Sequence, residues 1–216
     1  SHGLPSDAAD YLAMRNFIHF EDMAIPANID SVMQLMDIEN FAQLFMLQIY
    51  INNSDWLSNN RKCWKKRAVY NPNAPYGQDG RWRWLAFDLD HGFKLENQDR
   101  LDVVMSNSGS ETRIFKGLME NDDFRKYWIN LLADNMNTSF LADRLIAEMN
   151  ALNAIYDPEI PGHKDRWRNL WNNNSTQTME TFARERPHYM NQFVISQFLE
   201  VTDTAYVTLD VLNQTG

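Results

Sequence analysis

Two short polar segments carry the side chains of this sequence that are best suited to chemistry. The first, NNSDWLSNN, places Asp55 five positions before Asn60, directly after the apolar stretch FMLQIYI. The second, FDLDHGF, places Asp88 and Asp90 on either side of a leucine, at the end of an aromatic-rich run. Polar loops held on a rigid apolar element are typical of functional sites. These four residues are therefore the candidate site residues.

A β-strand that ends at Asp90 would place both acids of the second segment on one face. In a strand that stays regular, period-two alternation groups Trp82, Trp84, Ala86, Asp88 and Asp90. If this strand pairs with the preceding strand in a hairpin, its end lies near the start of that preceding strand, and so near the first polar segment. The four candidate residues would then line one acidic pocket.

Crowded carboxylates repel one another unless a cation neutralises them or they share a proton. The oxygen atoms of Asp and Asn suit Mg²⁺ or Ca²⁺ better than zinc. The alternative is that Asp55 and the neighbouring Asn residues form Asx-turns, while Asp88 and Asp90 only end a strand. The residues alone leave both interpretations open.

The elements that must position these segments are predicted to be mainly helical. Ser6 is a plausible N-cap for a first helix, and a second helix is expected to start at Asn28, after Pro26. Asp37 is predicted to cap the third helix, IENFAQLFMLQIYIN, which has a broad apolar face. From about Glu111 to residue 200 the pattern is helical again.

Between the two helical parts, RKCWKKRAVY and GRWRWLAFDLD predict two strands. Asn, Pro and Gly dominate the connection between them, which predicts a long hairpin loop. The final stretch, AYVTLDVLNQTG, alternates like a further strand. The predicted fold class is mainly α with a central β-hairpin.

Composition excludes several classes of function. The formal net charge of −9, from 20 basic and 29 acidic side chains, argues against nucleic acid as the main partner. The single cysteine, Cys63, allows no internal disulfide and no Cys-based zinc site. No apolar stretch approaches the roughly 18 residues of a membrane-spanning helix, so no transmembrane segment is expected in this chain.

Two groups of basic residues have open roles. RKCWKKR, residues 61–67, contains five cations and could attract phosphate or an acidic peptide, or could be a solvated strand edge kept basic against aggregation. Arg184 and Arg186 are expected to pair with the surplus of acids, although one buried Arg could face the pocket.

An Asp followed five positions later by Asn, and then a strand ending in Asp, is the catalytic order of protein kinases. The sequence has no H-R-D and no D-F-G, but it has DWLSNN and FDLDHGF. These motifs resemble those of the CotH (spore-coat protein H) kinase family. The likeness extends from about residue 28 to 200, through MDIENFAQLFMLQIYINNSD, GRWRWLAFDLDHGF, LMENDDFRKYWINLLADNMNTSF and ETFARERPHYMNQFV.

This resemblance implies a protein-kinase-like fold that binds ATP with Mg²⁺ (or Mn²⁺) and phosphorylates Ser or other hydroxyls. Asp55 would be the catalytic base that orients the acceptor hydroxyl, and Asn60 would hold a metal. Asp88 would be the principal Mg²⁺ ligand and Asp90 a second acidic ligand. The implied partners are a nucleotide and a secreted or surface protein, and the implied location is extracellular or in the cell envelope.

The sequence shows no G-x-G-x-x-G loop and no segment like the N-terminal kinase lobe. We therefore expect residues 6–200 to be the C-terminal lobe-like portion of a CotH kinase domain, which alone would bind nucleotide poorly. Residues 1–5 are expected to be a tag scar or linker, and residues 201–216 the start of a following β segment or a tail.

Two other functions remain open at this stage. A catalytically silent member of the family could serve as a surface-binding or adhesion module. A calcium-stabilised structural domain is the other alternative, because DLDHG resembles the D-x-D-x-G of calcium loops, without the closing Glu of a twelve-residue loop.

Overall fold

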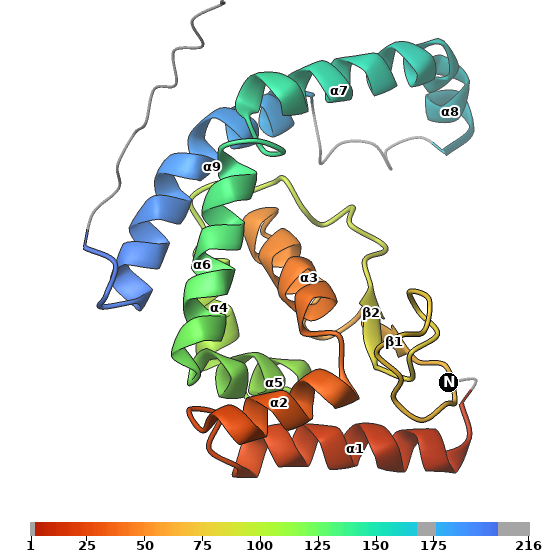
Figure 1. Cartoon of the computed structure of the whole chain (residues 1–216). Coiled ribbons are helices and arrows are strands. Elements are labelled where there is room, and N and C mark those ends of the chain that lie inside the picture. Colours follow the sequence, from red (N-terminus) through yellow and green to blue (C-terminus); the bar gives the residue numbers. More distant parts are fainter. Residues whose placement is uncertain (1–2, 168–175, 203–216) are drawn as a thin grey trace, which may run out of the picture.

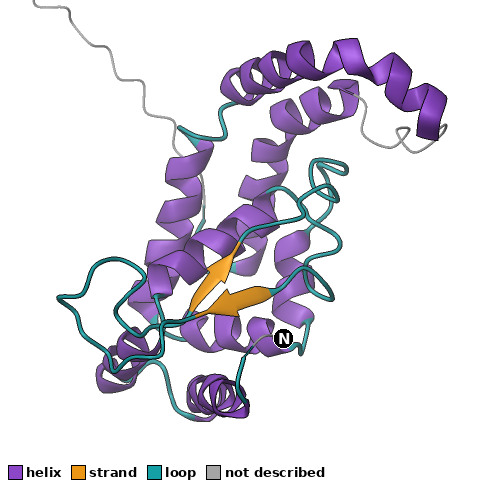
Figure 2. Ribbon diagram, turned by 90° about the vertical axis from the view of Figure 1, so that its right-hand side faces the viewer, coloured by secondary structure: helices purple, strands orange, loops and turns teal. Residues whose placement is uncertain are grey.

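The computed structural model describes residues 3–167 and 176–202. It is mainly helical with one two-stranded antiparallel hairpin, as predicted (Figures 1 and 2). In chain order the elements are α1 (Pro5–Phe20), α2 (Pro26–Leu35), α3 (Ile38–Tyr50), β1 (Lys62–Trp64), β2 (Arg83–Leu85), α4 (Arg100–Ser106), α5 (Ser110–Met119), α6 (Asp122–Met136), α7 (Ala142–Tyr156), the 3-10 turn η1 (Asp157–Glu159), α8 (Ile160–Trp167) and α9 (Thr176–Gln197).

Helix α3 lies at the centre of the molecule, between the hairpin and the helices α6 and α9 (Figure 1). Its sequence buries residues around most of its circumference, including Phe41, Phe45 and Tyr50, none of which is exposed. The Phe45 ring stacks on Phe115 of α5 and meets the edge of Trp56 at 4.6 Å between ring centroids. Such aromatic packing makes α3 a rigid support for the loop that follows it.

The start of α3 is fixed as predicted. Asp37 is its N-cap, and its carboxylate accepts a hydrogen bond from the Asn40 amide at 3.1 Å. The Asp37 amide in turn donates to the Trp82 carbonyl, and the Trp82 amide donates to the Leu35 carbonyl, both at 2.9 Å. The second strand is thereby anchored to the junction of α2 and α3.

The hairpin is shorter than the sequence suggested. Strands β1 and β2 have three residues each, with Cys63 opposite Trp84, and a long loop joins them as predicted. Trp82 and Trp84 share a face, since both contact the Tyr11 ring, as the alternation predicted. Arg83 between them is buried as well. Arg83 is buried because its guanidinium forms ion pairs with Asp79 at 2.6 Å and Asp37 at 2.9 Å.

Other expectations need correction at helix ends. Leu4 occupies the N-cap position of α1, and Ser6 lies inside its first turn. Helix α2 starts at Pro26, where the fixed φ of proline favours the first helical position, rather than at Asn28. Helix α4 was not predicted.

The basic run of residues 61–67 is largely neutralised within the molecule. Arg61 pairs with Glu111 of α5, and Lys65 pairs with Asp10 of α1 at 2.8 Å. Arg67 likewise pairs with Asp7 at 2.7 Å. These contacts hold the hairpin against α1 and α5, and they engage three of the five cations of the run.

The described helices include none long and apolar enough to cross a membrane. The predicted strand in residues 205–216 lies outside the described residues. So do Ser1 and His2 of the expected tag scar.

Candidate functional site

The loop after α3 holds Asp55 by two side-chain amides. Asn59 Nδ2 donates to Asp55 Oδ1 at 2.7 Å, and Asn60 Nδ2 donates to Asp55 Oδ2 at 2.9 Å. Both oxygens of the carboxylate are therefore oriented from within the loop. Trp56, 2% exposed, anchors the loop on the core.

Part of this loop is an Asx-turn, as the alternative interpretation proposed. Asn53 Oδ1 accepts a hydrogen bond from the Asp55 amide at 3.1 Å, and Asn53 itself is fully buried. Asn52 and Asn60 both have positive φ, 52° and 54°. Asn tolerates this left-handed region better than most residues, which explains the abundance of Asn here.

The second acidic segment is a loop rather than a strand end. Strand β2 stops at Leu85, and Asp88 has a positive φ of 55°. The assumption that the strand stays regular to Asp90 is therefore wrong, and so is the argument that alternation places both acids on one face. Asp88 and Asp90 are both exposed, and Asp90 Oδ2 lies 4.0 Å from His91 Nε2.

The two loops nevertheless lie side by side. The Phe93 amide donates to the Ile51 carbonyl at 2.8 Å, which is a direct backbone link between them. Ser54 Oγ lies 3.4 Å from His91 Nδ1, and Asn53 Nδ2 lies at 3.5 Å from the Asp88 carbonyl. The hairpin thus returns the acidic loop to the Asp55 loop, as predicted.

Beneath the loops, polar side chains are buried. Asn52 Nδ2 donates to the Leu95 carbonyl at 2.8 Å and to Gln98 Oε1 at 3.1 Å, while its Oδ1 accepts from Arg100 Nε at 3.0 Å. Arg186 of α9 is fully buried in the same region. Sequence reasoning allowed one buried Arg facing the pocket, but Arg186 binds backbone carbonyls below it instead.

The charge state of Arg186 follows from this burial. Desolvation lowers the pKa of its guanidinium to about 10. Arg186 therefore remains a buried cation at neutral pH.

The acidic side chains of the site differ in number from those of a preformed metal cage. In residues 3–167 and 176–202, no three His, Cys, Asp or Glu side chains form a group that could hold a metal ion. Calcium takes about six to eight oxygen ligands, which include backbone and Asn carbonyls as well as carboxylates. Magnesium is commonly held by only one or two carboxylates together with substrate phosphates and water.

Two of the candidate residues suit that limited role. Because Asn60 uses its NH₂ group on Asp55, its Oδ1 is the atom left for a metal. Asp88 is exposed at the tip of the neighbouring loop.

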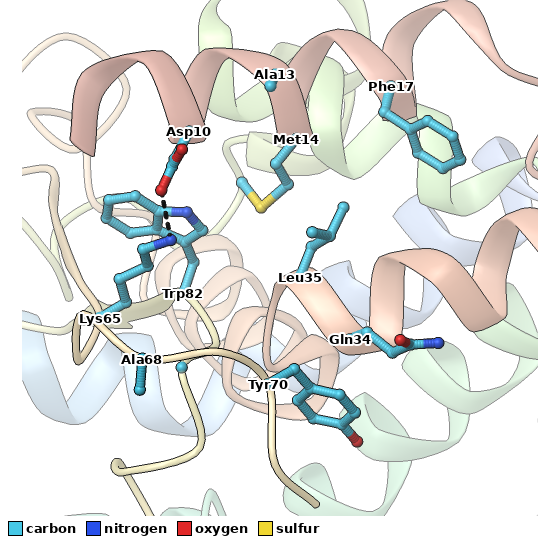
Figure 3. Close-up of a pocket in the computed structure, with 11 residues that line it drawn as sticks. Asp10, Ala13, Met14, Phe17, Gln34, Leu35, Lys65, Ala68, Tyr70 and Trp82 are labelled. Carbon is cyan, nitrogen blue, oxygen red and sulfur yellow. Dashed lines mark hydrogen bonds and ion pairs between the residues drawn. The ribbon is translucent and has the colours of Figure 1, made fainter. Parts of the chain in front are cut away.

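A half-open cavity of about 430 Å³ lies elsewhere, between α1, the end of α2 and the hairpin loop (Figure 3). Met14, Leu35 and Trp82 give it an apolar lining, and the Lys65–Asp10 ion pair lies at its edge. None of the four candidate residues lines it. It is therefore separate from the site.

A family model matches most of the chain. The model of a family described as CotH kinase protein matches residues 2–190 of the 216-residue chain. The search of curated proteins found no match, and the search of solved structures found none either.

Proposed function

Because the chain belongs to the CotH kinase protein family, we propose that it carries the phosphoryl-transfer site of an atypical secreted protein kinase. The substrates are ATP and a Ser or other hydroxyl on a secreted or surface protein. In this proposal the described helices and hairpin are the equivalent of a kinase C-terminal lobe. The enzyme acts outside the cell or in the cell envelope.

The observation that carries this proposal is the pair of amide hydrogen bonds on Asp55. A residue that orients an acceptor hydroxyl must itself be held in one rotamer. Asn59 and Asn60 do this for Asp55, through bonds of 2.7 and 2.9 Å. The five-residue spacing from Asp55 to Asn60 is that of the kinase catalytic loop.

Asp55 would act on the acceptor hydroxyl. The hydroxyl oxygen forms a bond to the γ-phosphorus of ATP, and the bond from that phosphorus to the β–γ bridging oxygen breaks, so ADP leaves. The hydroxyl proton passes to the Asp55 carboxylate, which is partly exposed and can receive a substrate from solvent. The main requirement on the base is that its carboxylate lies close to the acceptor hydroxyl.

Asn60 and Asp88 would hold the magnesium ion, with Asp90 as a further acidic ligand. When bound, Mg²⁺ (or Mn²⁺) neutralises charge on the β- and γ-phosphates. The order of elements supports these roles, because a buried helix, the Asp–Asn loop, a hairpin and the acidic loop follow one another as in kinases. The backbone hydrogen bond from the Phe93 amide to the Ile51 carbonyl supports this assignment, because it joins the segment after Asp88 to the residue before the Asp55 loop.

Transfer of label from γ-labelled ATP to protein tests this function. We expect Asp55→Asn and Asp88→Asn, made in the protein at its natural length, each to lower the rate by at least about 100-fold, the usual contribution of such groups. Asp134→Asn, an exposed aspartate of α6, is the matched control and should be unaffected. Undiminished transfer in both site variants would show that these residues are not the active site.

Thermal denaturation with Mg²⁺, Mn²⁺ or Ca²⁺ separates the alternatives. Stabilisation by Mg²⁺ or Mn²⁺ that requires ATP supports the kinase site. Stabilisation by Ca²⁺ alone, without nucleotide, would instead indicate a structural calcium domain. Absence of both transfer and nucleotide-dependent stabilisation would favour a silent binding module.

A further inference from the structure

Arg186 makes four hydrogen bonds, all to backbone carbonyls. Its Nε donates to the Tyr50 carbonyl and Nη2 donates to the Ile49 carbonyl, both at 2.8 Å. Its Nη1 donates to the carbonyls of Glu96 at 2.6 Å and Gln98 at 2.8 Å. One planar guanidinium thus joins two chain segments that are far apart in sequence.

These two segments are the bases of the candidate loops. Ile49 and Tyr50 are the last residues of α3, directly before the loop that holds Asp55. Glu96 and Gln98 follow the acidic loop, after its link from Phe93 to Ile51. Arg186 therefore joins the two chain segments from which the Asp55 loop and the acidic loop extend.

A buried cation is costly, and an apolar side chain of similar volume is often at least as stabilising. Two features offset the cost at Arg186. The C-terminus of α3 presents the negative end of its dipole to the guanidinium, and the rings of Phe182 and Phe193 lie 5.5 and 5.4 Å from it. The presence of a charged guanidinium at this buried position is better explained by its ability to bind several carbonyls at once than by a gain in stability.

We propose that Arg186 is a positioning residue, which fixes the distance between the Asp55 loop and the Asp88 loop. The inference rests on the proposed function for its catalytic consequence, but its structural part stands independently. A lysine at this position could not replace it, because its ammonium group donates from a single point and cannot reach two segments at once. Asn52 reinforces the same junction through Leu95 and Arg100.

Amide hydrogen exchange in the 216-residue chain tests the structural part. In Arg186→Lys and Arg186→Met, the Phe93 amide, which links the loops, should exchange about tenfold faster or more, as expected for local opening. The Phe41 amide at the other end of α3, bonded to the Asp37 carbonyl, is the reference and should not change. Arg184→Lys, an exposed position on the same helix that pairs with Asp143 at 3.6 Å, is the matched control.

Steady-state kinetics at natural length test the catalytic part. Loop misplacement should lower kcat by tenfold or more at a temperature where the variant is folded, with a smaller change in the KM for ATP. Equal acceleration of exchange at Phe93 and Phe41, unchanged exchange at both, or failure of Arg186→Lys to fold would each overturn the proposal. If the unsubstituted protein transfers no phosphate, the proposed function fails, while hydrogen exchange still decides the role of Arg186.

Discussion

Asn52 combines an uncommon backbone conformation with three side-chain hydrogen bonds. Its φ is 52°, its exposed fraction is 2%, and it bonds Leu95, Gln98 and Arg100. The left-handed conformation costs a residue other than Gly or Asn about 1–2 kcal/mol. Asn52 Oδ1 also accepts the hydrogen bond of Arg100 Nε, which is buried and would lose this acceptor on substitution.

Substitution separates these two contributions. Asn52→Ala should lower the free energy of unfolding by about 3 kcal/mol, because it loses the bonds and strains the backbone. Asn52→Gly loses the same bonds without the strain, so it should be more stable than Asn52→Ala by about 1 kcal/mol. Urea unfolding measures both. Equal stabilities of the two variants would mean that the backbone strain is negligible.

At the residue scale, the sequence nominated the candidate side chains but did not predict how they are held. The spacing of Asp55 and Asn60 was sufficient to nominate both. The pattern could not distinguish Asn52, which is buried under the loop, from Asn59, which faces the Asp55 carboxylate. Residue type is the same for both, and only tertiary contacts separate their roles.

At the scale of elements, α1 and α5 pack together through a glycine. A Cβ on Gly117 of α5 would lie 2.7 Å from the Ile18 carbonyl oxygen and 2.8 Å from Ile18 Cγ2. Backbone atoms cannot move aside as a flexible side chain can, so the two helices would have to separate. Gly162 of α8, by contrast, has nothing within 4 Å of the same position.

Alanine substitution at these two glycines should therefore have opposite effects. Gly162→Ala should stabilise the protein by about 0.5–1 kcal/mol, the usual helix propensity gain. Gly117→Ala should destabilise it by about 1–3 kcal/mol, because overpacking outweighs that gain. Thermal unfolding of both variants provides the test. A Gly117→Ala protein as stable as the wild type would show that α1 and α5 are not in close contact.

Elements with a long apolar pattern were the ones that sequence could predict. Helix α3, capped by Asp37, is an example. Helix α4 has only seven residues, too few for periodicity to appear, and it buries Arg100, a residue type usually exposed. Strand β2 ends at Leu85, and the positive φ at Asp88 excludes a regular strand that continues to Asp90.

At the scale of the whole molecule, the hairpin is attached by two kinds of ion pair. The pairs of Lys65 with Asp10 and Arg67 with Asp7 join it to α1, but each has a largely exposed member. Exposed pairs contribute about 0–1 kcal/mol. Arg83, 1% exposed, pairs with Asp79 and with Asp37 at the start of α3. Within this buried network, the Arg83–Asp37 pair joins the hairpin to the helical core, beside the backbone bonds of Trp82.

Acid should weaken this network in a defined pH range. The hydrogen bond from Arg83 holds the pKa of Asp79 well below its usual value of about 4. Its contribution to stability is therefore fully present above about pH 5, and is lost as the pH falls below 4 toward the lowered pKa. Asp79→Asn should cost about 3 kcal/mol at pH 7, since it leaves buried Arg83 without its main partner. The difference between this variant and the wild type should shrink at pH 3.

Urea unfolding at pH 7 and pH 3 measures that difference, and Asp134→Asn, at an exposed aspartate, is the control. A gap between Asp79→Asn and the wild type that stays constant between the two pH values would mean that Asp79 titrates alike in the folded and unfolded chains. Arg83 would then not lower the pKa of Asp79 in the folded protein. Because Arg83 also pairs with Asp37, the N-cap of α3, a change at Asp79 acts on a network that reaches the helix supporting the Asp55 loop.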